Sequence, residues 1–262
     1  MNKLLLVCLT CCFFGCQTQI PEKQRKPLFE HFPPQKTVNN PKWGEKLQDI
    51  KNHEVFYENN FKDLVTTAHE ATHDISIFFR MNEQQHYFRK INAFYVFDNK
   101  VAIIENPPIA LEKVYNFIPK ELKGKLFDNY FPNAGYQDNP LYIWEEWTAY
   151  VNGAEVGTDL VENELWNQGK RDTLLATLEF LVYSAALVIA TQELAPLYYQ
   201  TYPNFEEFFA WNAKRTWRVY KKTQKLSPFD NDLHRNYLKI LKTSTQAKKL
   251  RLFLQNYVEI NN

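Results

Sequence analysis

The segment His69-Glu70-Ala71-Thr72-His73 brings together the residue types that bind a metal ion and activate a water on it. Residues four positions apart lie one turn above the other on one face of a helix, so the imidazoles of His69 and His73 reach a single ion. Zinc accepts neutral imidazole nitrogen, and a catalytic zinc site combines three protein ligands with a water. Glu70, beside the first histidine, is placed to take a proton from that water.

The sequence around this segment has the spacing of a helix with one apolar face. Apolar residues recur every three or four positions and form a stripe that faces the core. The stripe comprises Leu64, Ala68, Ala71, Ile75, Phe78 and Phe79. His69 and His73 lie at its margin, where a helix that lines a cleft would place them. This position argues against two ordinary surface histidines.

The pentapeptide resembles the active-site motif of the zincin metallopeptidases. That resemblance implies zinc (Zn2+) as the cofactor, Glu70 as the general base, and hydrolysis of a peptide or protein substrate. The third ligand decides the zincin subfamily. Metzincins have a glycine three residues and a histidine six residues after the second histidine, whereas this chain has Ser76 and Phe79 at those positions. The metzincin subfamily is therefore excluded.

With the other zincin subfamilies excluded, a glutamate from a later helix remains as the source of the third ligand. Another zincin group uses an aspartate from a Gly-Thr-x-x-Asp segment, but Gly157-Thr158 is followed by Val161 at that place. Gluzincins, which include thermolysin-like enzymes, use a helix that reads Glu-x-x-small-polar, and Glu146 begins such a run. Tyr150, one turn later, would occupy the position that orients a ligand by hydrogen bonding. The resemblance therefore implies the metal ligands His69, His73 and Glu146.

Two other acids remain open as the third ligand. Glu145 stands beside Glu146, but a helix turns its side chain about 100° away. Glu179 lies in the middle of the apolar segment Leu174–Ala190, and a buried carboxylate must be paired, protonated or bound to metal. A hydrogen bond to Tyr183, one turn away, would make Glu179 a structural or supporting acid. We expect this segment to be a central buried helix, because about 17 residues with a carboxylate are a poor membrane span.

Candidates for stabilising the oxyanion of the reaction come from three other positions. In some gluzincins a late histidine stabilises the tetrahedral intermediate, and His234 is the one histidine in the later half of the chain. Tyr136 and Tyr142 lie close to Glu146 in the sequence and could donate a hydrogen bond in the same way. No motif selects among these three.

The beginning of the chain has the pattern of an export signal. A charged start is followed by an apolar run from Leu4 to Phe14 and by Gly15-Cys16, which is too short for a membrane span. Gly15-Cys16 resembles the lipobox of bacterial lipoproteins, in which the cysteine is acylated and becomes the mature N-terminus. The resemblance implies a signal peptide over residues 1–15, lipidation at Cys16 and a protein of the bacterial cell envelope. By resemblance to Gram-negative lipoproteins, Gln17 after the cysteine indicates the outer membrane.

Composition limits the remaining chemistry. All four cysteines lie in the leader, so the mature chain would keep only Cys16, and disulfides, a thiol nucleophile and a cysteine-ligated metal are excluded from the folded domain. The net charge of +1 gives no electrostatic case for nucleic acid. Five prolines between residues 17 and 41 predict an extended tether over residues 16–43. Residues 44–262 suffice for one domain with a substantial core.

The remaining patterns predict an α+β fold that is predominantly helical. Only 7 glycines occur among 262 residues, which disfavours a turn-rich β sandwich. The β-rich runs Ile91–Phe97 and Val101–Glu105 flank a short turn and predict a hairpin, either as scaffold or as a partner strand for a peptide. The C-terminal stretch alternates aromatic and basic residues, which is typical of amphipathic helices with solvated faces. We expect a zincin-like active-site helix, a β-hairpin and a helical C-terminal part.

These expectations combine into an envelope-anchored, zinc-dependent peptide hydrolase that uses a metal-activated water. Its expected partners are a lipid membrane, through acylated Cys16, and a peptide or protein substrate, with no nucleic acid. The alternative is a non-catalytic lipoprotein with a zincin-like fold that acts as a binding or assembly factor. A third interpretation is a helical structural lipoprotein in which the pentapeptide is coincidental.

Overall fold

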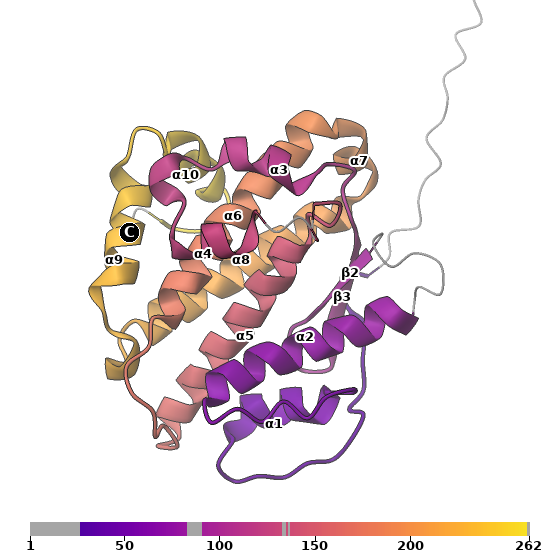
Figure 1. The fold of residues 1–262 in the computed structure, drawn as a ribbon, viewed down its shortest axis with the longest axis vertical. Helices are drawn as coiled ribbons and strands as arrows, with labels where there is room; N and C mark the ends of the chain where they lie inside the picture. Colours follow the sequence, from indigo (N-terminus) through magenta and orange to yellow (C-terminus); the bar gives the residue numbers. More distant parts are fainter. Residues whose placement is uncertain (1–26, 83–90, 133–134, 136, 261–262) are drawn as a thin grey trace, which may run out of the picture.

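The computed structural model of the chain describes residues 27–82, 91–132, 135 and 137–260 (Figure 1). The predicted signal peptide, the lipidation site Cys16 and Tyr136 lie outside the described residues. The chain is mostly helical, at 62%, and it carries one small three-stranded antiparallel sheet. The predicted α+β, predominantly helical class is therefore confirmed.

Ten α-helices follow one another along the described part of the chain, joined by three short 3₁₀ helices at Tyr115–Phe117, Lys120–Leu122 and Ser227–Phe229. The first five helices are α1 (Gly44–His53), α2 (Leu64–Asn82), α3 (Leu111–Val114), α4 (Lys125–Tyr130) and α5 (Tyr142–Glu162). The remaining five are α6 (Thr173–Leu194), α7 (Pro196–Thr201), α8 (Pro203–Thr223), α9 (Asp232–Thr243) and α10 (Lys248–Leu254).

The sheet contains the predicted hairpin. Strands β2 (Ile91–Tyr95) and β3 (Lys100–Glu105) pair antiparallel, and β1 (Glu30–His31) adds to the other edge of β3. Phe97, Asp98 and Asn99 form the turn with φ of +66°, +54° and +59°, and aspartate and asparagine tolerate this left-handed region better than most residues. From Asn92 onward β2 is buried, because it packs against α2 and α5.

The longest helices form the centre of the fold. α5 packs against α2 on one side and against α6 and α8 on the other, as Figure 1 shows. Gly153 of α5 lets α2 approach closely, because a methyl group at this position would lie 3.2 Å from the backbone oxygen of Val65. α6 has the length and composition of a membrane-spanning helix, but 94% of its apolar window is buried inside the fold. In this structure α6 is therefore a core helix.

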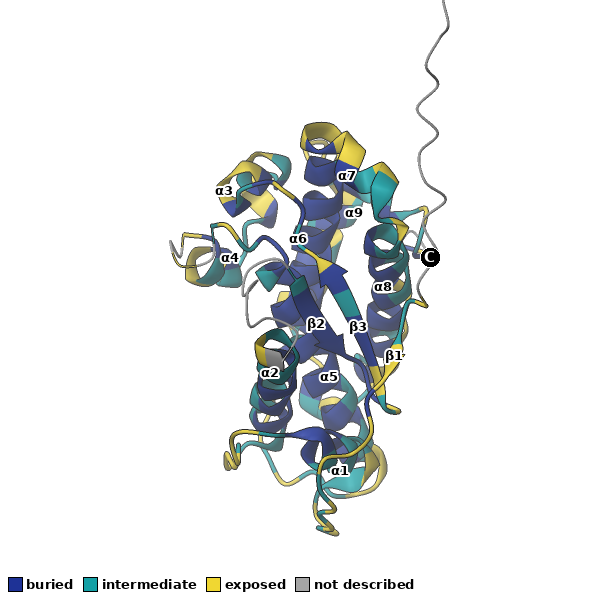
Figure 2. Cartoon of the chain, turned by 90° about the vertical axis from the view of Figure 1, so that its right-hand side faces the viewer, coloured by how far each residue is buried: buried dark blue, intermediate teal, exposed yellow. Residues whose placement is uncertain are grey.

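The described part of the predicted tether packs onto the fold. Glu30 pairs with Val101 in the sheet, and the side chain of Phe32 is buried. The ring of Phe29 meets the edge of Trp211 on α8 at 4.8 Å between centroids. Figure 2 shows β1 beside α8 on one side of the molecule, with α2 and α4 on the other. Packed structure thus begins before residue 44, where the sequence analysis placed the start of the domain.

Candidate metal centre

Two helices bring three potential metal ligands together. α2 presents His69 and His73, whose Nε2 atoms lie 3.1 Å apart. α5 presents Glu146 from the facing side, with one carboxylate oxygen 3.4 Å from the Nε2 of His73 and the other 3.4 Å from the Nε2 of His69. Ligand atoms of all three residues lie within 4.8 Å of one another. The close packing of α2 on α5 therefore joins residues that are far apart in the sequence.

The spacing of these atoms suits a single metal ion. Zinc bonds of 2.0–2.1 Å at tetrahedral angles hold two ligand atoms roughly 3.3 Å apart. The two Nε2 atoms lie 3.1 Å apart, and each lies 3.4 Å from a different carboxylate oxygen of Glu146. Two imidazoles and one carboxylate are a ligand set of catalytic zinc sites that keep a fourth position open. The carboxylate oxygen of Glu146 that lies nearer to His69 is buried and accepts no hydrogen bond from the described residues. A bound metal ion would compensate the negative charge of this oxygen.

The electrostatics of the cluster also favour a cation at this place. Burial alone would raise the pKa of Glu146, but His73 and His69 outweigh burial and hold the pKa of this carboxyl far below its usual value. Burial alone would lower the pKa of His73, but Glu146 and Glu145 outweigh it and raise the pKa of the imidazole well above its usual value. The proton held in this way on His73 is the positive charge that a metal ion would replace.

Glu145, which the sequence left open as a competing ligand, contacts the other side of His73. Its Oε1 lies 3.0 Å from the Nδ1 of His73, and its Oε2 is paired with Arg80. Arg80 also donates to the side chain of Asn92 on β2 at 3.2 Å. A carboxylate on Nδ1 fixes the ring of a metal-binding histidine and leaves its Nε2 for the ion. Glu145 therefore positions His73 from outside the three-residue cluster.

The sequence carried a signal for this arrangement. Arg80 follows His73 by seven residues and so lies on the same face of α2, two turns further along. An arginine in line with the two histidines calls for a carboxylate on the facing helix, and the pair Glu145-Glu146 supplies one acid for the arginine and one for the cluster. From the sequence, Glu145 and Glu146 were alternatives for the third ligand. In the structure both contact His73, Glu145 at Nδ1 and Glu146 at Nε2.

Tyr150 packs on a candidate ligand and bonds elsewhere. Its ring meets that of His69 at 4.5 Å between centroids, whereas its hydroxyl lies 3.0 Å from the hydroxyl of Tyr130. Burial, as the largest cause, raises the pKa of Tyr150 to about 12. From the sequence we expected Tyr150 to orient a ligand by hydrogen bonding. Among the described contacts, Glu145 makes such a bond, to His73. Tyr150 instead packs its ring against that of His69.

Tyr130 of α4 is the candidate that sequence reasoning missed. Burial first, and then the charge of Glu146, raise the pKa of Tyr130 far above its usual value, so its hydroxyl stays protonated and remains a hydrogen-bond donor. No spacing in the sequence relates Tyr130 to the histidines, so periodicity could not single it out. Of the tyrosines chosen instead, Tyr142 begins α5 outside the residues that line the cleft.

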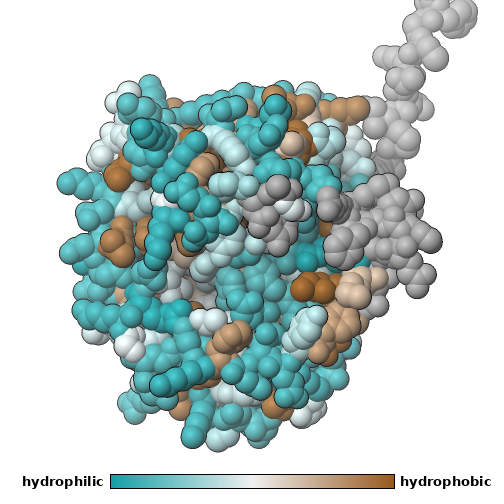
Figure 3. Space-filling view, in the orientation of Figure 1, coloured by the Kyte–Doolittle hydropathy of each residue, from teal (hydrophilic) through white to brown (hydrophobic). Residues whose placement is uncertain are grey.

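A cleft of about 340 Å³ opens beside the cluster. Its lining includes His69 and Glu70 of α2, Tyr130 of α4 and Tyr150 of α5, together with Lys125 and Arg171. Figure 3 shows the face of the molecule that carries α2, α4 and α5, and it is largely hydrophilic with scattered apolar side chains. Glu70 thus lies in the wall of the cleft, one residue from a candidate ligand. The hairpin strands do not line this cleft, which favours the scaffold interpretation of β2 and β3.

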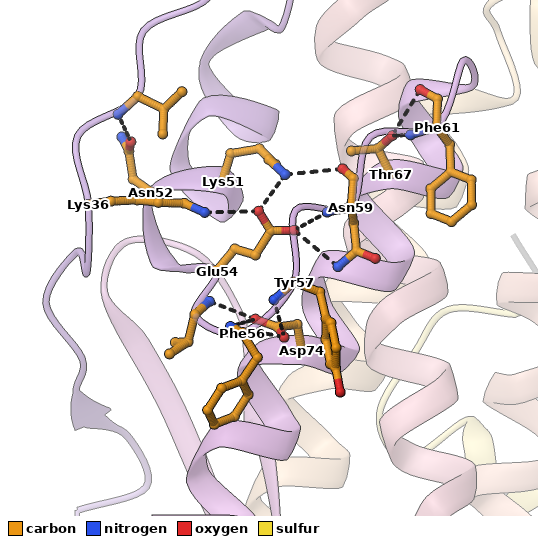
Figure 4. Close-up of polar contacts among 12 residues, drawn as sticks. Lys36, Lys51, Asn52, Glu54, Phe56, Tyr57, Asn59, Phe61, Thr67 and Asp74 are labelled. Atoms are coloured by element: carbon orange, nitrogen blue, oxygen red, sulfur yellow. Dashed lines mark hydrogen bonds and ion pairs between the residues drawn. The ribbon is translucent and has the colours of Figure 1, made fainter.

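The residue after His73 ties the ligand helix to the preceding loop (Figure 4). The buried carboxylate of Asp74 accepts hydrogen bonds from the backbone N–H groups of Val55, Phe56 and Tyr57 at 2.6 to 3.1 Å. These charge-assisted bonds are among the stronger ones in proteins. They anchor α2 at the turn that carries His73, on the side facing away from Glu146.

Glu54 secures the same loop at its start. Its carboxylate is buried and accepts hydrogen bonds from Lys36 at 3.1 Å and from the backbone of Asn59 at 2.9 Å, and it is paired with Lys51. Thr67 of α2 accepts a further bond from the backbone N–H of Phe61 at 3.0 Å. Figure 4 shows these contacts as separate groups, around Glu54, around Asp74 and between Phe61 and Thr67, which together tie the loop to α1 and α2.

Glu179 and Tyr183 lie on α6 and hold the segment that carries Tyr130. The hydroxyl of Tyr183 donates to Glu179 at 3.0 Å, and the backbone N–H of Leu126 donates to the same carboxylate oxygen at 3.0 Å. Tyr183 also accepts from the backbone of Gly124 at 3.0 Å. Burial raises the pKa of Glu179. Glu179 is not part of the three-residue cluster; its hydrogen bond from Leu126 ties α4 to α6.

His234, a candidate for the oxyanion, lies elsewhere in the fold. It is buried on α9, with its Nδ1 3.0 Å from the hydroxyl of Tyr220 on α8. It does not line the cleft beside the cluster. Burial lowers the pKa of His234, so the imidazole is neutral at pH 7. Its position is that of a core histidine between two helices.

Comparisons with known proteins identify no relative. No family model, no curated protein and no solved structure matches this chain. The resemblance to the zincins therefore rests on the pentapeptide of α2 and the glutamate of α5. What the site does has to be argued from the geometry of its own residues.

Proposed function

We propose that this chain is a zinc-dependent hydrolase of peptide bonds. The observation that carries the proposal is the convergence of the His69 and His73 Nε2 atoms, 3.1 Å apart, on the Glu146 carboxylate, which has one oxygen 3.4 Å from each; this arrangement suits one zinc ion. When bound, zinc polarises a carbonyl and lowers the pKa of its water to about 7. The open cleft beside His69 gives a substrate access to this side of the cluster.

Glu70 moves the proton in this proposal. Its carboxylate lies in the cleft wall next to His69, so it takes a proton from the attacking water and returns it to the nitrogen of the departing amine. One water is consumed, the amide C–N bond breaks, and a carboxylate and an amine leave. Glu70 is regenerated in each cycle, as a general base and acid must be.

Tyr130 supplies the hydrogen bond to the oxygen that becomes negative during attack. Its hydroxyl is kept protonated by its surroundings and it lines the same cleft. A donor that is already oriented before the reaction stabilises developing charge without reorganisation. The hydroxyl of Tyr150, 3.0 Å away, holds Tyr130 in place. The site therefore offers ligands, a base and an oxyanion donor.

The place of action follows from the leader. Gly15-Cys16 resembles a bacterial lipobox, so the hydrolase would be tethered by acylated Cys16 in the cell envelope, at the outer membrane. Substrates would then be proteins or peptides that reach this compartment.

The test is zinc content by elemental mass spectrometry on protein purified without added metal, together with turnover of a quenched-fluorescence peptide library. We expect about one zinc per chain and its loss in His69→Ala and in Glu146→Ala, with peptide turnover in the wild type alone. Absence of zinc after incubation with it would refute the proposal. Stoichiometric zinc without turnover of any peptide would replace the hydrolase by a binding or assembly factor.

A further inference from the structure

The net charge of +1 hides a strong separation of charge along the chain. Residues 203–262 contain 12 lysines and arginines against 5 acids, whereas residues 1–202 contain 19 against 25. The last quarter of the chain therefore has a charge of +7, and the rest has −6. Because α8 begins at Pro203, the positive part coincides with the C-terminal helices.

Four of these cations lie on the outer face of α8, and a fifth lies in the turn just after its end. Their spacing of four, three and one residues keeps the four on one side of the helix: Lys214, Arg218, Lys221 and Lys222, followed by Lys225. We call this set the α8 basic face. Lys221 is paired with Glu259 at 3.2 Å and Lys222 with Glu162 at 2.6 Å. For the other three, which are exposed, the described residues provide no ion pair.

A shallow hollow of about 710 Å³ lies within the α8 basic face. The five cations border it, and Trp217 and Tyr257 line it between them. Aromatic rings framed by lysine and arginine are the combination that proteins use at the headgroup level of a membrane. This hollow is wider and more open than the cleft beside the metal centre, and none of the cluster residues borders it.

The chain enters the fold on this same face. Phe29 packs on Trp211, and Trp211 precedes Lys214 by three residues, so it lies on the same side of α8. From Cys16 to Pro27 the chain has 11 residue-to-residue steps, which span about 40 Å at most. A lipid anchor at Cys16 would therefore keep Pro27, which lies two residues before Phe29, within that distance of the bilayer.

The opposite side of the molecule carries the cleft. α2 and α4 lie on one side of α5 and α6, and α8 lies on the other (Figures 1 and 2). A molecule that rested on a membrane through α8 would therefore direct the cleft toward the aqueous phase. The face with the positive charge is also the one from which the predicted tether leaves.

We propose that the α8 basic face docks on the surface of an anionic phospholipid bilayer and holds the cleft away from it. Lys214, Arg218 and Lys225 contact lipid phosphates, and the half-buried ring of Tyr257 lies at the headgroup level, while Trp217 stays buried. Each cation near such a surface strengthens binding about fivefold. This docking does not depend on zinc or on peptide hydrolysis.

The test is vesicle flotation of the full chain with Cys16→Ser, which removes acylation. Vesicles of phosphatidylcholine alone are compared with an equal mixture of phosphatidylcholine and phosphatidylglycerol. The leader and tether carry cations of their own, and their contribution is the same in the wild type and in a variant of the α8 basic face. We expect the wild type to prefer the anionic vesicles and to be released by salt. The triple variant Lys214→Glu, Arg218→Glu and Lys225→Glu should lose about a hundredfold in partitioning onto them.

A matched control changes the net charge by the same amount elsewhere: Lys42→Glu, Lys113→Glu and Lys120→Glu, all exposed and outside α8. This control should keep its preference for anionic vesicles. Equal partitioning of the wild type onto both vesicles would overturn the proposal, as would an equal loss in the control. Binding of the wild type to soluble heparin without binding to anionic vesicles would overturn it as well. If the triple variant does not fold, the proposal is tested by whether salt releases the wild type from the anionic vesicles; binding that salt does not weaken would overturn it.

Discussion

The candidate metal centre and the α8 basic face use charged side chains in opposite ways. Around His73, charges of both signs are paired within 3.0 to 3.4 Å, and the pKa values of His73 and Glu146 depart far from their usual values. The α8 basic face carries cations, and three exposed ones have no ion-pair partner among the described residues. Buried ion pairs hold their side chains in a fixed geometry, as a catalytic site needs. Exposed charges of one sign instead attract a large surface of opposite charge through their combined electrostatic field.

This difference predicts how each region responds to mutation. Removing one partner of the buried network should cause a large and local loss, because the remaining charge is left uncompensated. Removing one exposed lysine should cause a small loss that adds to the others and disappears at high salt.

Glu70→Gln should lower peptide turnover by about 10² to 10⁴-fold, because the amide cannot take the proton of the attacking water. Zinc content should stay at the wild-type value, since Glu70 is not part of the ligand cluster. Turnover is measured on a peptide identified with the library, and zinc by elemental mass spectrometry. The triple charge reversal on α8 is the counterpart and should leave turnover of a soluble peptide unchanged. Full activity in a zinc-loaded Glu70→Gln enzyme would exclude Glu70 as the base.

Tyr130→Phe should lower kcat by about 10² to 10³-fold, the usual cost of losing one oxyanion donor. KM and zinc content should change little, because the phenyl ring still fills the place of the tyrosine ring. Tyr142→Phe is the matched control, since Tyr142 does not line the cleft, and it should retain full kcat. If the two variants have equal kcat, the donor is another group and Tyr130 serves packing alone.

How far the sequence predicts this molecule depends on the range of the interaction. Features set by neighbouring residues in the sequence could be predicted: the face shared by His69 and His73, the apolar stripe of α2, and the hairpin with its Asp98-Asn99 turn. Each depends on local periodicity or on backbone preference. The helical class with a small sheet follows from the same local patterns, and it is confirmed.

Features that require two distant segments could be predicted only in part. The acids at 145 and 146 were singled out, but their division of roles depends on Arg80 and on the angle at which α5 crosses α2. Tyr130 was missed because its place depends on how Glu179 and Tyr183 hold the start of α4. Periodicity carries no information on such contacts. His234 shows the opposite error, since a histidine without a partner motif proved to be a core residue.

Glu145→Gln should weaken zinc binding by about 10 to 100-fold without abolishing it. The amide keeps the shape of the side chain but loses the charge that fixes His73 and balances Arg80. Zinc affinity is measured by competition with a chromophoric chelator, so the readout does not depend on turnover. Glu162→Gln, which breaks the exposed pair with Lys222, is the control and should leave zinc affinity unchanged. Complete loss of zinc in Glu145→Gln, with zinc retained in Glu146→Gln, would exchange the roles of the two acids.

Glu179→Gln tests a buried acid away from the cluster and should have the smallest effect. Burial raises the pKa of Glu179 in the folded state, so folded protein holds this proton more tightly than unfolded protein. The stability that this acid contributes is therefore fully present below its unfolded pKa and is lost as pH rises through the higher folded value. Glutamine cannot ionise, and its amide oxygen still accepts from Tyr183 and Leu126, so the variant should avoid that loss.

The measurement is urea denaturation of both proteins at a series of pH values. The free energy of unfolding of Glu179→Gln, relative to the wild type, should increase as pH rises from the usual pKa of glutamate to the raised folded value, and then level off. Glu259→Gln removes an exposed acid and should show no such trend. A relative stability that falls over the same range would mean that the ionised carboxylate is favoured in the folded state. In that case Glu179 would hold α4 as an ionised carboxylate, and it would resemble the buried carboxylate of Glu146 in carrying a charge.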